Sequence, residues 1–153
     1  MPLLSALLHA SDDALRIGRA VESLRPCDEV LVIDHGSTDA TARVARDYGA
    51  TVLAATPGAD PAAHARHYWI LCLLPNEALT EALEASLHEW KRSDPGDAPG
   101  FALSLREEAG DGWRQLPPQL RLVHRRRITW TGPLPPNQPA PLLAGDLLRF
   151  ARP

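Results

Sequence analysis

The chain has 153 residues, of which 44% are hydrophobic and 23% are charged, and its formal net charge at pH 7 is −3. These values are typical of one folded domain and exclude a disordered chain, and the nearly balanced charge gives no indication of a nucleic acid partner. No stretch approaches the roughly 20 apolar residues that a membrane-spanning helix needs, so no transmembrane segment is predicted.

The two cysteines, Cys27 and Cys72, have neither the spacing of a metal site nor a disulfide framework around them. Free cysteines of this kind are typical of a reducing compartment. The N-terminal stretch MPLLSALLHASDD carries no basic leader before its short apolar run. A cytoplasmic location is therefore expected.

The first 55 residues alternate between apolar runs and helical stripes. Strands are predicted over residues 3–8, 29–33 and 51–55, because each is a short apolar run bounded by polar or turn residues. Helical spacing of apolar residues predicts one helix after Ser11-Asp12-Asp13 and a second helix from Thr41. This order favours a parallel, doubly wound sheet with right-handed crossovers.

The next segment, residues 56–67, is loop-like with at most one helical turn, and residues 68–73 (YWILCL) predict a fourth buried strand. Thr80 is expected to cap an amphipathic helix that ends near residue 93. Alternating patterns then predict three short strands, which suggest an antiparallel extension of the sheet. These strands cover residues 101–105, 119–125 and 128–132.

Five prolines between Pro133 and Pro141 predict an irregular, extended segment. We therefore divide the chain into a single domain over residues 1–132 and a proline-rich C-terminal arm over residues 133–153. The apolar stretch LLAGDLLRF, residues 142–150, is suited to pack either on a partner subunit or on the chain's own sheet. The oligomeric state stays open.

The stretch VIDHGSTDAT, residues 32–41, places Asp34 at the end of a buried strand. Ligands of open parallel sheets bind beyond the carboxyl ends of the strands, and a carboxylate there is costly unless a partner pairs with it. Gly36 permits a sharp turn, and Ser37 or Thr38 can cap the next helix while Asp39 lies in its positive first turn. Residues 37–39 are explained equally well as a helix cap alone.

A linked series of motifs resembles the family 2 glycosyltransferases of the GT-A fold, in particular those that decorate bacterial lipopolysaccharide and cell-envelope sugars. The series is HASDD (9–13), IGRAVESL (17–24), DEVLVID (28–34) and GSTDAT (36–41). Further on, WILCLLPNEALT (69–80) and QLRLVHRRRITWTGPLPP (119–136) match the family more weakly. The resemblance implies an α/β, Rossmann-like GT-A fold whose nucleotide-binding half is residues 1–77.

The resemblance also implies a nucleotide-sugar partner of the UDP, GDP or CDP type. Residues around His9 to Asp13 would line the nucleoside, Asp34 would hydrogen-bond the base, and Asp39 would help to hold the nucleotide. The nucleotide-binding residues predicted in this way are His9, Ser11, Asp13, Asp34, Gly36, Ser37 and Asp39.

The family holds Mg²⁺ or Mn²⁺ with a D-A-D motif, because hard cations prefer carboxylate oxygens. This chain has Leu74, Pro75 and Asn76 at those positions, so both aspartates are missing. Asn76 and Glu77 are the remaining candidate metal ligands, and they are equally typical of a turn before the next helix. Metal dependence is therefore doubtful.

Two further family features are missing. The His-Glu pair after W-x-G, whose acidic member is a plausible general base, is replaced by Pro135-Pro136. The helix between the third and fourth strands is replaced by a short loop, and family members are usually longer than this chain. The side chains that could contact a diphosphate without a metal are His64, Arg66, His67, Arg121, His124, Arg125, Arg126 and Arg127. Arg121 is favoured because it lies in the matched Q-x-R-L pattern, whereas HRRR is more typical of an exposed turn.

Two functions follow from these observations. The chain is either a nucleotide-sugar-dependent glycosyltransferase, metal-independent or with a displaced metal site, or a degenerate relative that serves as a nucleotide-binding or scaffolding module. The three losses favour the second function. A receiver-like phospho-acceptor domain is disfavoured, because Ala55 stands where its acceptor aspartate would end the third strand.

Overall fold

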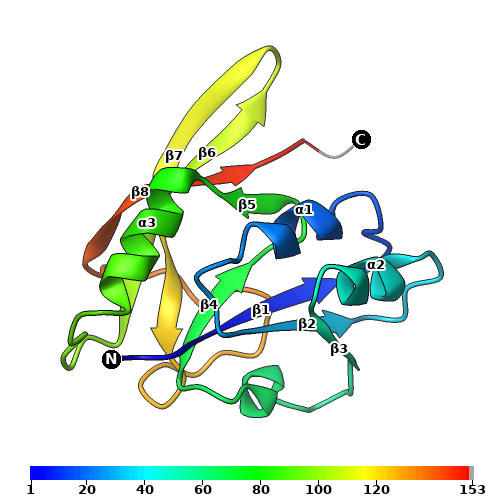
Figure 1. Ribbon diagram of the computed structural model, residues 1–153, viewed down its shortest axis with the longest axis horizontal. Coiled ribbons are helices and arrows are strands. Elements are labelled where there is room, and N and C mark those ends of the chain that lie inside the picture. Colours follow the sequence, from blue (N-terminus) through cyan, green and yellow to red (C-terminus); the bar gives the residue numbers. More distant parts are fainter. Residues whose placement is uncertain (152–153) are drawn as a thin grey trace.

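The computed structural model describes residues 1–151 and contains one mixed sheet of eight strands in the order β3-β2-β1-β4-β7-β6-β8-β5 (Figure 1). The strands are β1 (Leu4–Ala10), β2 (Glu29–Asp34), β3 (Thr51–Ala54), β4 (Trp69–Leu73), β5 (Glu77–Leu79), β6 (Gly100–Ala109), β7 (Gly112–His124) and β8 (Leu142–Arg149). The helices are α1 (Ile17–Glu22), α2 (Thr41–Asp47), the 3-10 helix η1 (Pro61–His64) and α3 (Glu81–Trp90).

Strands β3, β2, β1 and β4 pair in parallel and form the predicted nucleotide-binding half of the sheet. Figure 1 shows α1 and α2 on one side of these strands and η1 on the other. The parallel strands are apolar on both faces, because helices or loops cover each face. The predicted class, a mostly parallel α/β sheet with an antiparallel extension, is confirmed.

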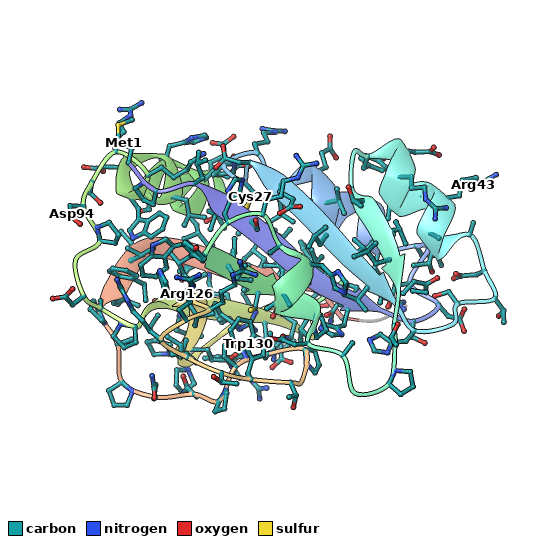
Figure 2. All side chains as sticks on the ribbon, turned by 90° about the horizontal axis from the view of Figure 1, so that it is seen from below. Met1, Cys27, Arg43, Asp94, Arg126 and Trp130 are labelled. Atoms are coloured by element: carbon teal, nitrogen blue, oxygen red, sulfur yellow. The ribbon has the colours of Figure 1, made fainter. Side chains whose placement is uncertain are left out.

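Alternate residues of each central strand enter two separate apolar cores. Leu71 and Leu73 of β4 pack with α1 and α3 on one face, whereas Ile70 and Cys72 pack on the opposite face. That opposite face is covered by η1 and by residues 128–140, with Trp130 among its buried side chains (Figure 2). The proline-rich segment therefore covers one face of the sheet.

The antiparallel part is built on a long hairpin of β6 and β7, whose tip extends beyond the rest of the molecule in Figure 1. β7 contains Pro117 and Pro118, and the register with β6 shifts between Leu103 and Leu105, opposite these two residues. Because proline donates no backbone hydrogen bond, a shift in register is where a strand tolerates it.

The C-terminal stretch 142–150, whose packing the sequence left open, packs on the chain's own sheet. Its strand β8 lies between β6, which it pairs in parallel, and β5, which it pairs antiparallel. Gly145 in β8 has φ of +94°, and a Cβ there would lie 2.7 Å from Cα of Leu83 in α3. This close approach lets α3 pack directly on β8.

Three local predictions are wrong. Residues 128–132 form no strand, because they cover one face of the sheet. Trp130 is buried there, in the apolar core that contains Ile70 and Cys72. Asn76 lies in a turn as expected, but Glu77 begins the short strand β5, since β8 supplies hydrogen-bonding partners. The first helix begins only at Ile17, after the turn in which the backbone oxygen of Asp13 accepts from the amides of Arg16 and Ile17.

Candidate nucleotide crevice

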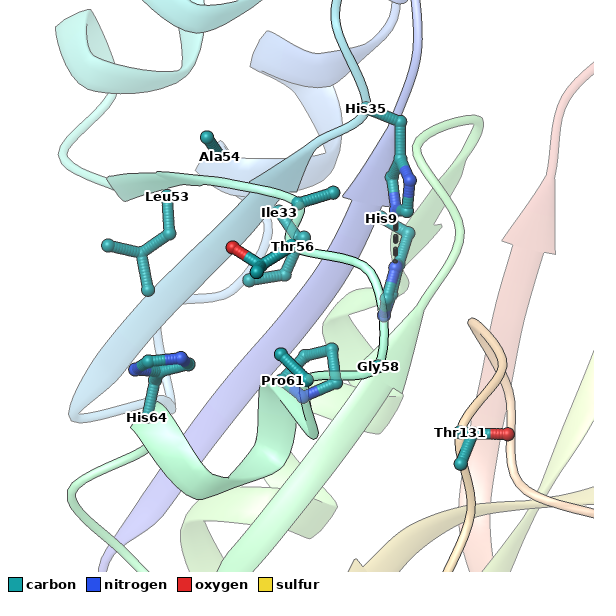
Figure 3. Close-up of a pocket in the computed structure, with 12 residues that line it drawn as sticks. His9, Ile33, His35, Leu53, Ala54, Thr56, Gly58, Pro61, His64 and Thr131 are labelled. Carbon is teal, nitrogen blue, oxygen red and sulfur yellow. Dashed lines mark hydrogen bonds between the residues drawn. The ribbon is translucent and has the colours of Figure 1, made fainter.

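Two adjoining cavities lie at the carboxyl ends of the parallel strands, where such sheets bind ligands. The first, of about 260 Å³, is lined by the ends of β1, β2 and β3 and by the segment from Ala55 to His64 (Figure 3). The second, of about 360 Å³, lies between Ser11, Asp13 and the Leu74-Pro75 turn after β4. His9, His35 and Thr131 line both, so we treat the two cavities as one crevice.

Asp34 ends β2 as predicted, but its side chain is not among the residues that line the crevice. Its Oδ1 accepts hydrogen bonds from the hydroxyl and the amide of Ser37. Its neighbours in the chain, Ile33 and His35, do line the first cavity. Gly36 has φ of +71° and makes the sharp turn after the strand, as the sequence predicts.

Acidic side chains in the loops after β1 and β2 accept hydrogen bonds that connect the two loops. Asp12, which has φ of +51°, accepts hydrogen bonds from the amides of Thr38 and Asp39. Asp39 in return accepts from the amide of Ala14 and from the amide and hydroxyl of Thr41. These bonds lower the pKa of Asp39, the hydroxyl of Thr41 contributing most.

The predicted site residues Ser11 and Asp13 line the second cavity. Asp13 is buried, and its carboxylate accepts from the amide of Ser11 and from the guanidinium of Arg16, with an Arg16 Nη2 to Oδ1 distance of 2.6 Å. Its negative charge is therefore compensated within the chain. Ser37, by contrast, contacts Asp34 and the amide of Asp12 and does not line the crevice.

His9 and His35 form the wall shared by the two cavities. Nδ1 of His9 lies 2.8 Å from Nε2 of His35, and the rings are stacked with centroids 5.0 Å apart (Figure 3). The other ring nitrogen of His9, Nε2, is buried and has no hydrogen-bond partner among residues 1–151. Burial, followed by the nearby His35, lowers the pKa of His9.

The candidate metal ligand Glu77 is fully buried, and both of its oxygens are occupied. Arg121 contacts it through two hydrogen bonds of 2.7 and 2.8 Å, and Arg149 and the amide of Leu74 also donate to it. Asn76 offers only one buried amide oxygen without a partner in the described chain. A cation-binding carboxylate must face its metal, so this donor set does not fit a divalent cation.

Arg121, the predicted phosphate contact, is fully buried and bridges β7 to β5 through Glu77. The neighbouring arginines lie elsewhere: Arg125 and Arg126 contact the exposed ring of Tyr68, outside the crevice. In residues 1–151 there is no group of three or more His, Cys, Asp or Glu side chains arranged to hold a metal.

Several crevice residues were not among the predicted nucleotide-binding residues, including His35 and Thr131, and His64 was considered only as a possible diphosphate contact. His35 follows Asp34 directly in the quoted motif, so its position at the strand end was available from the sequence. His64 lies in the one helical turn of the loop after β3, and Thr131 in the stretch mistaken for a strand. Their place in the crevice depends on loop packing, which short-range patterns do not encode.

The fold is similar to that of solved GT-A glycosyltransferases, which confirms the resemblance stated from the motifs. The solved structure of residues 1–349 of TarS from S. aureus matches 75% of this chain and 38% of its own, with a TM-score of 0.56 and 19% identity. Mannosyl-3-phosphoglycerate synthase from Rubrobacter xylanophilus matches 72% of this chain and 42% of its own, with a TM-score of 0.53 and 19% identity.

In sequence, the chain is 44% identical over 61 residues to 4,4'-diaponeurosporenoate glycosyltransferase of Staphylococcus aureus (strain bovine RF122 / ET3-1). The match covers 37% of this chain and 16% of that relative. No family model matches the chain. The chain thus spans less than half the length of the relatives and solved structures that it resembles. Among the described residues, no helix combines the length and apolar character needed to span a bilayer.

Proposed function

We propose that the chain binds a nucleoside diphosphate sugar in the crevice, with the nucleoside in the first cavity and the diphosphate and sugar toward the second. The observation that carries this proposal is the pair of cavities at the strand ends of a GT-A fold, lined by His9, His35 and Thr131. A solved glucosyl-3-phosphoglycerate synthase from Mycobacterium tuberculosis, with a TM-score of 0.51, contains Mn²⁺ and UDP-glucose. This likeness in fold supports the choice of ligand class.

The activity proposed first is transfer of the sugar from the nucleotide to an acceptor. The second proposed function is a catalytically inactive nucleotide-binding or scaffolding module. It is favoured by Leu74 and Pro75, which line the second cavity where the family's first metal-binding positions fall, and by Glu77, which is held in ion pairs. Mg²⁺ or Mn²⁺ dependence is not expected from these residues, although the solved relative contains Mn²⁺.

Calorimetric titration with UDP-, GDP- and CDP-sugars, each with EDTA, Mg²⁺ or Mn²⁺, tests the proposal. We expect nucleotide sugars of one base to bind, with an affinity that differs little between EDTA, Mg²⁺ and Mn²⁺. Release of free sugar over hours would support an enzyme, and binding without release would support the module. Absence of binding for all three donor types would contradict the proposal and leave only the shared fold.

A further inference from the structure

The His9–His35 pair connects the two cavities through a single hydrogen bond. The facing atoms are Nδ1 of His9 and Nε2 of His35, so the outer nitrogens are Nε2 of His9 and Nδ1 of His35. Nε2 of His9 is buried without a partner in the described chain. Figure 3 shows the His9 ring between His35 and the segment that carries Gly58 and Pro61.

Hydrogen-bond chemistry limits the number of protons on this pair. The two facing nitrogens share one proton, because one must donate and the other must accept. In the neutral pair, therefore, only one of the two outer nitrogens carries hydrogen. One added proton makes both outer nitrogens donors and keeps the bond between the rings, whereas a second added proton would set two N–H groups against each other.

The acidic groups around the crevice already accept hydrogen bonds within the chain. Asp13 is paired with Arg16, Asp34 accepts from Ser37, and Asp12 and Asp39 accept from loop amides. His64, on the opposite wall of the first cavity, is the other histidine that lines the crevice, and Asp13, which is paired with Arg16, lines the second cavity. An anion there would find its opposite charge only on imidazoles, and it would favour their protonated form.

We propose that the His9–His35 pair is the phosphate-binding group of the crevice and takes up one proton when a diphosphate binds, in the absence of a carboxylate-held metal. The proton comes from solvent, and the charged pair then donates to phosphate oxygens. Identification of that diphosphate with a nucleotide rests on the proposed function, whereas recognition of the anion itself does not.

Inorganic pyrophosphate and UDP, titrated in EDTA between pH 6 and 8, test this proposal. Calorimetry in two buffers of different ionisation enthalpy counts the protons, and we expect uptake approaching one per anion. Affinity should rise as the pH falls, by up to about tenfold per pH unit. His9→Gln and His35→Gln should each weaken pyrophosphate binding at pH 6 at least about tenfold and remove most of the pH dependence, since the ring charge is lost.

His88→Gln is the matched control, because His88 is exposed on α3 and outside the crevice; it should bind like the parent protein. No pyrophosphate binding, binding without proton uptake, or unchanged affinity in both crevice variants would overturn the proposal. The proton count on the parent protein needs no variant, so misfolding cannot obscure it. If pyrophosphate binds with proton uptake but UDP binds no more tightly, the proposed nucleotide function fails and the phosphate site stands. If UDP binds tightly only with Mn²⁺ and without proton uptake, the nucleotide function stands and the histidine phosphate site fails.

Discussion

Arg121 and Glu77 form a fully buried ion pair whose energetic consequence can be measured. Removing one member leaves the other charge buried without its main partner, which costs about 3–5 kcal/mol in comparable pairs. We therefore expect Arg121→Met and Glu77→Gln each to lower the free energy of unfolding by about that amount. Urea denaturation monitored by circular dichroism measures the loss.

Arg114 and Glu107 provide the control, because their ion pair has the same 2.7 Å distance but an Arg114 side chain that is 66% exposed. Arg114→Met should cost at most about 1 kcal/mol, the usual value of an exposed pair. Equal losses for the exposed and the buried pair would show that Arg121 contributes no more than a surface contact. Such a result would reopen a phosphate-binding role for it.

Asp34 remains the proposed contact to the base, although its Oδ1 is bound to Ser37. The second oxygen accepts no hydrogen bond from the described residues, although the side chain does not line the crevice. We expect Asp34→Ala to reduce nucleotide affinity at least about tenfold, the loss of roughly 1.4 kcal/mol or more. Calorimetry with the nucleotide sugar that binds in the proposed titration measures this effect. Asp47→Ala, at the exposed end of α2, should bind normally, and unchanged affinity in Asp34→Ala would remove Asp34 from the site.

Two histidines are expected to make the stability of the fold depend on pH. Burial lowers the pKa of His9 and of His124, with His35 adding to the shift of the first and Arg127, Arg126 and Arg125 to that of the second. A histidine whose pKa is lower in the folded state binds more protons when unfolded. The free energy of unfolding should therefore fall as the pH drops below about 6.5, the usual histidine value.

Urea denaturation at pH 7.5, 6.5 and 5.5 tests this dependence, and His124→Gln should make it shallower. The side chain of His124 stacks on Tyr68 in a region remote from the crevice, so the effect is separate from ligand binding. His88→Gln should leave the pH dependence unchanged. A parent protein whose stability rises toward pH 5.5 would contradict the expected sign.

At the scale of elements, the contact between β8 and α3 depends on one glycine. Gly145 has φ of +94°, and an added Cβ would lie 2.7 Å from Cα of Leu83 and 2.8 Å from the carbonyl carbon of Ala82. Side chains other than glycine are strained in this backbone region, and the clash is with helix backbone that cannot rotate away. Gly145→Ala should therefore cost more than about 3 kcal/mol, as other overpacked and strained sites do.

Thermal unfolding of Gly145→Ala and Gly112→Ala compares a crowded glycine with an open one. Gly112, at the start of β7, has no atom within 4 Å of its added Cβ and no positive φ. Its alanine variant should change stability by no more than about 0.5 kcal/mol. Similar melting temperatures for both variants would mean that the backbone of α3 does not pack closely against Gly145.

The elements that the sequence predicted well are those whose pattern is local. EVLVI and WILCL are apolar on both faces because each face of a parallel strand is covered, and Thr80 caps α3 through its own hydroxyl. β5 and β8 were missed because each owes its pairing to a strand distant in the chain. Pro117 and Pro118 hid the first half of β7, since the register shift that accommodates them is visible only in the paired hairpin.

The crevice shows the same division between local and distant information. The position of Asp34 at the strand end follows from the motif alone, and so does the turn at Gly36. The contacts of Arg121 do not follow from its motif, because they depend on β5, which brings Glu77 to Arg121, and β8 adds Arg149 as a second partner of Glu77. Pairing of His9 with His35 required the parallel register of β1 with β2, in which Ala10 lies opposite Asp34.

At the scale of the whole molecule, residues 133–149 contribute to both the sheet and the second core. Leu134 and Ala140 pack on the face that contains Trp130, Asn137 accepts a hydrogen bond from the amide of Leu120, and β8 lies between β6 and β5. A chain cut after Gly132 would expose that face and leave an inner position of the sheet empty. We expect it to lose cooperative unfolding and to aggregate, because unpaired strand edges and exposed apolar faces promote association.

A second chain, cut after Phe150, keeps β8 and the hydrogen bond from the amide of Phe150 to the oxygen of Asn76. It should have the same oligomeric state and a similar urea midpoint as the parent protein, because it retains β8 and both of its neighbouring strands. Two measurements on the truncated chains, size-exclusion chromatography with light scattering and urea denaturation, test whether residues 133–149 are an attached arm or a structural part of the domain. If the chain ending at Gly132 is folded and unfolds cooperatively, residues 1–132 are stable by themselves and the sheet does not require β8.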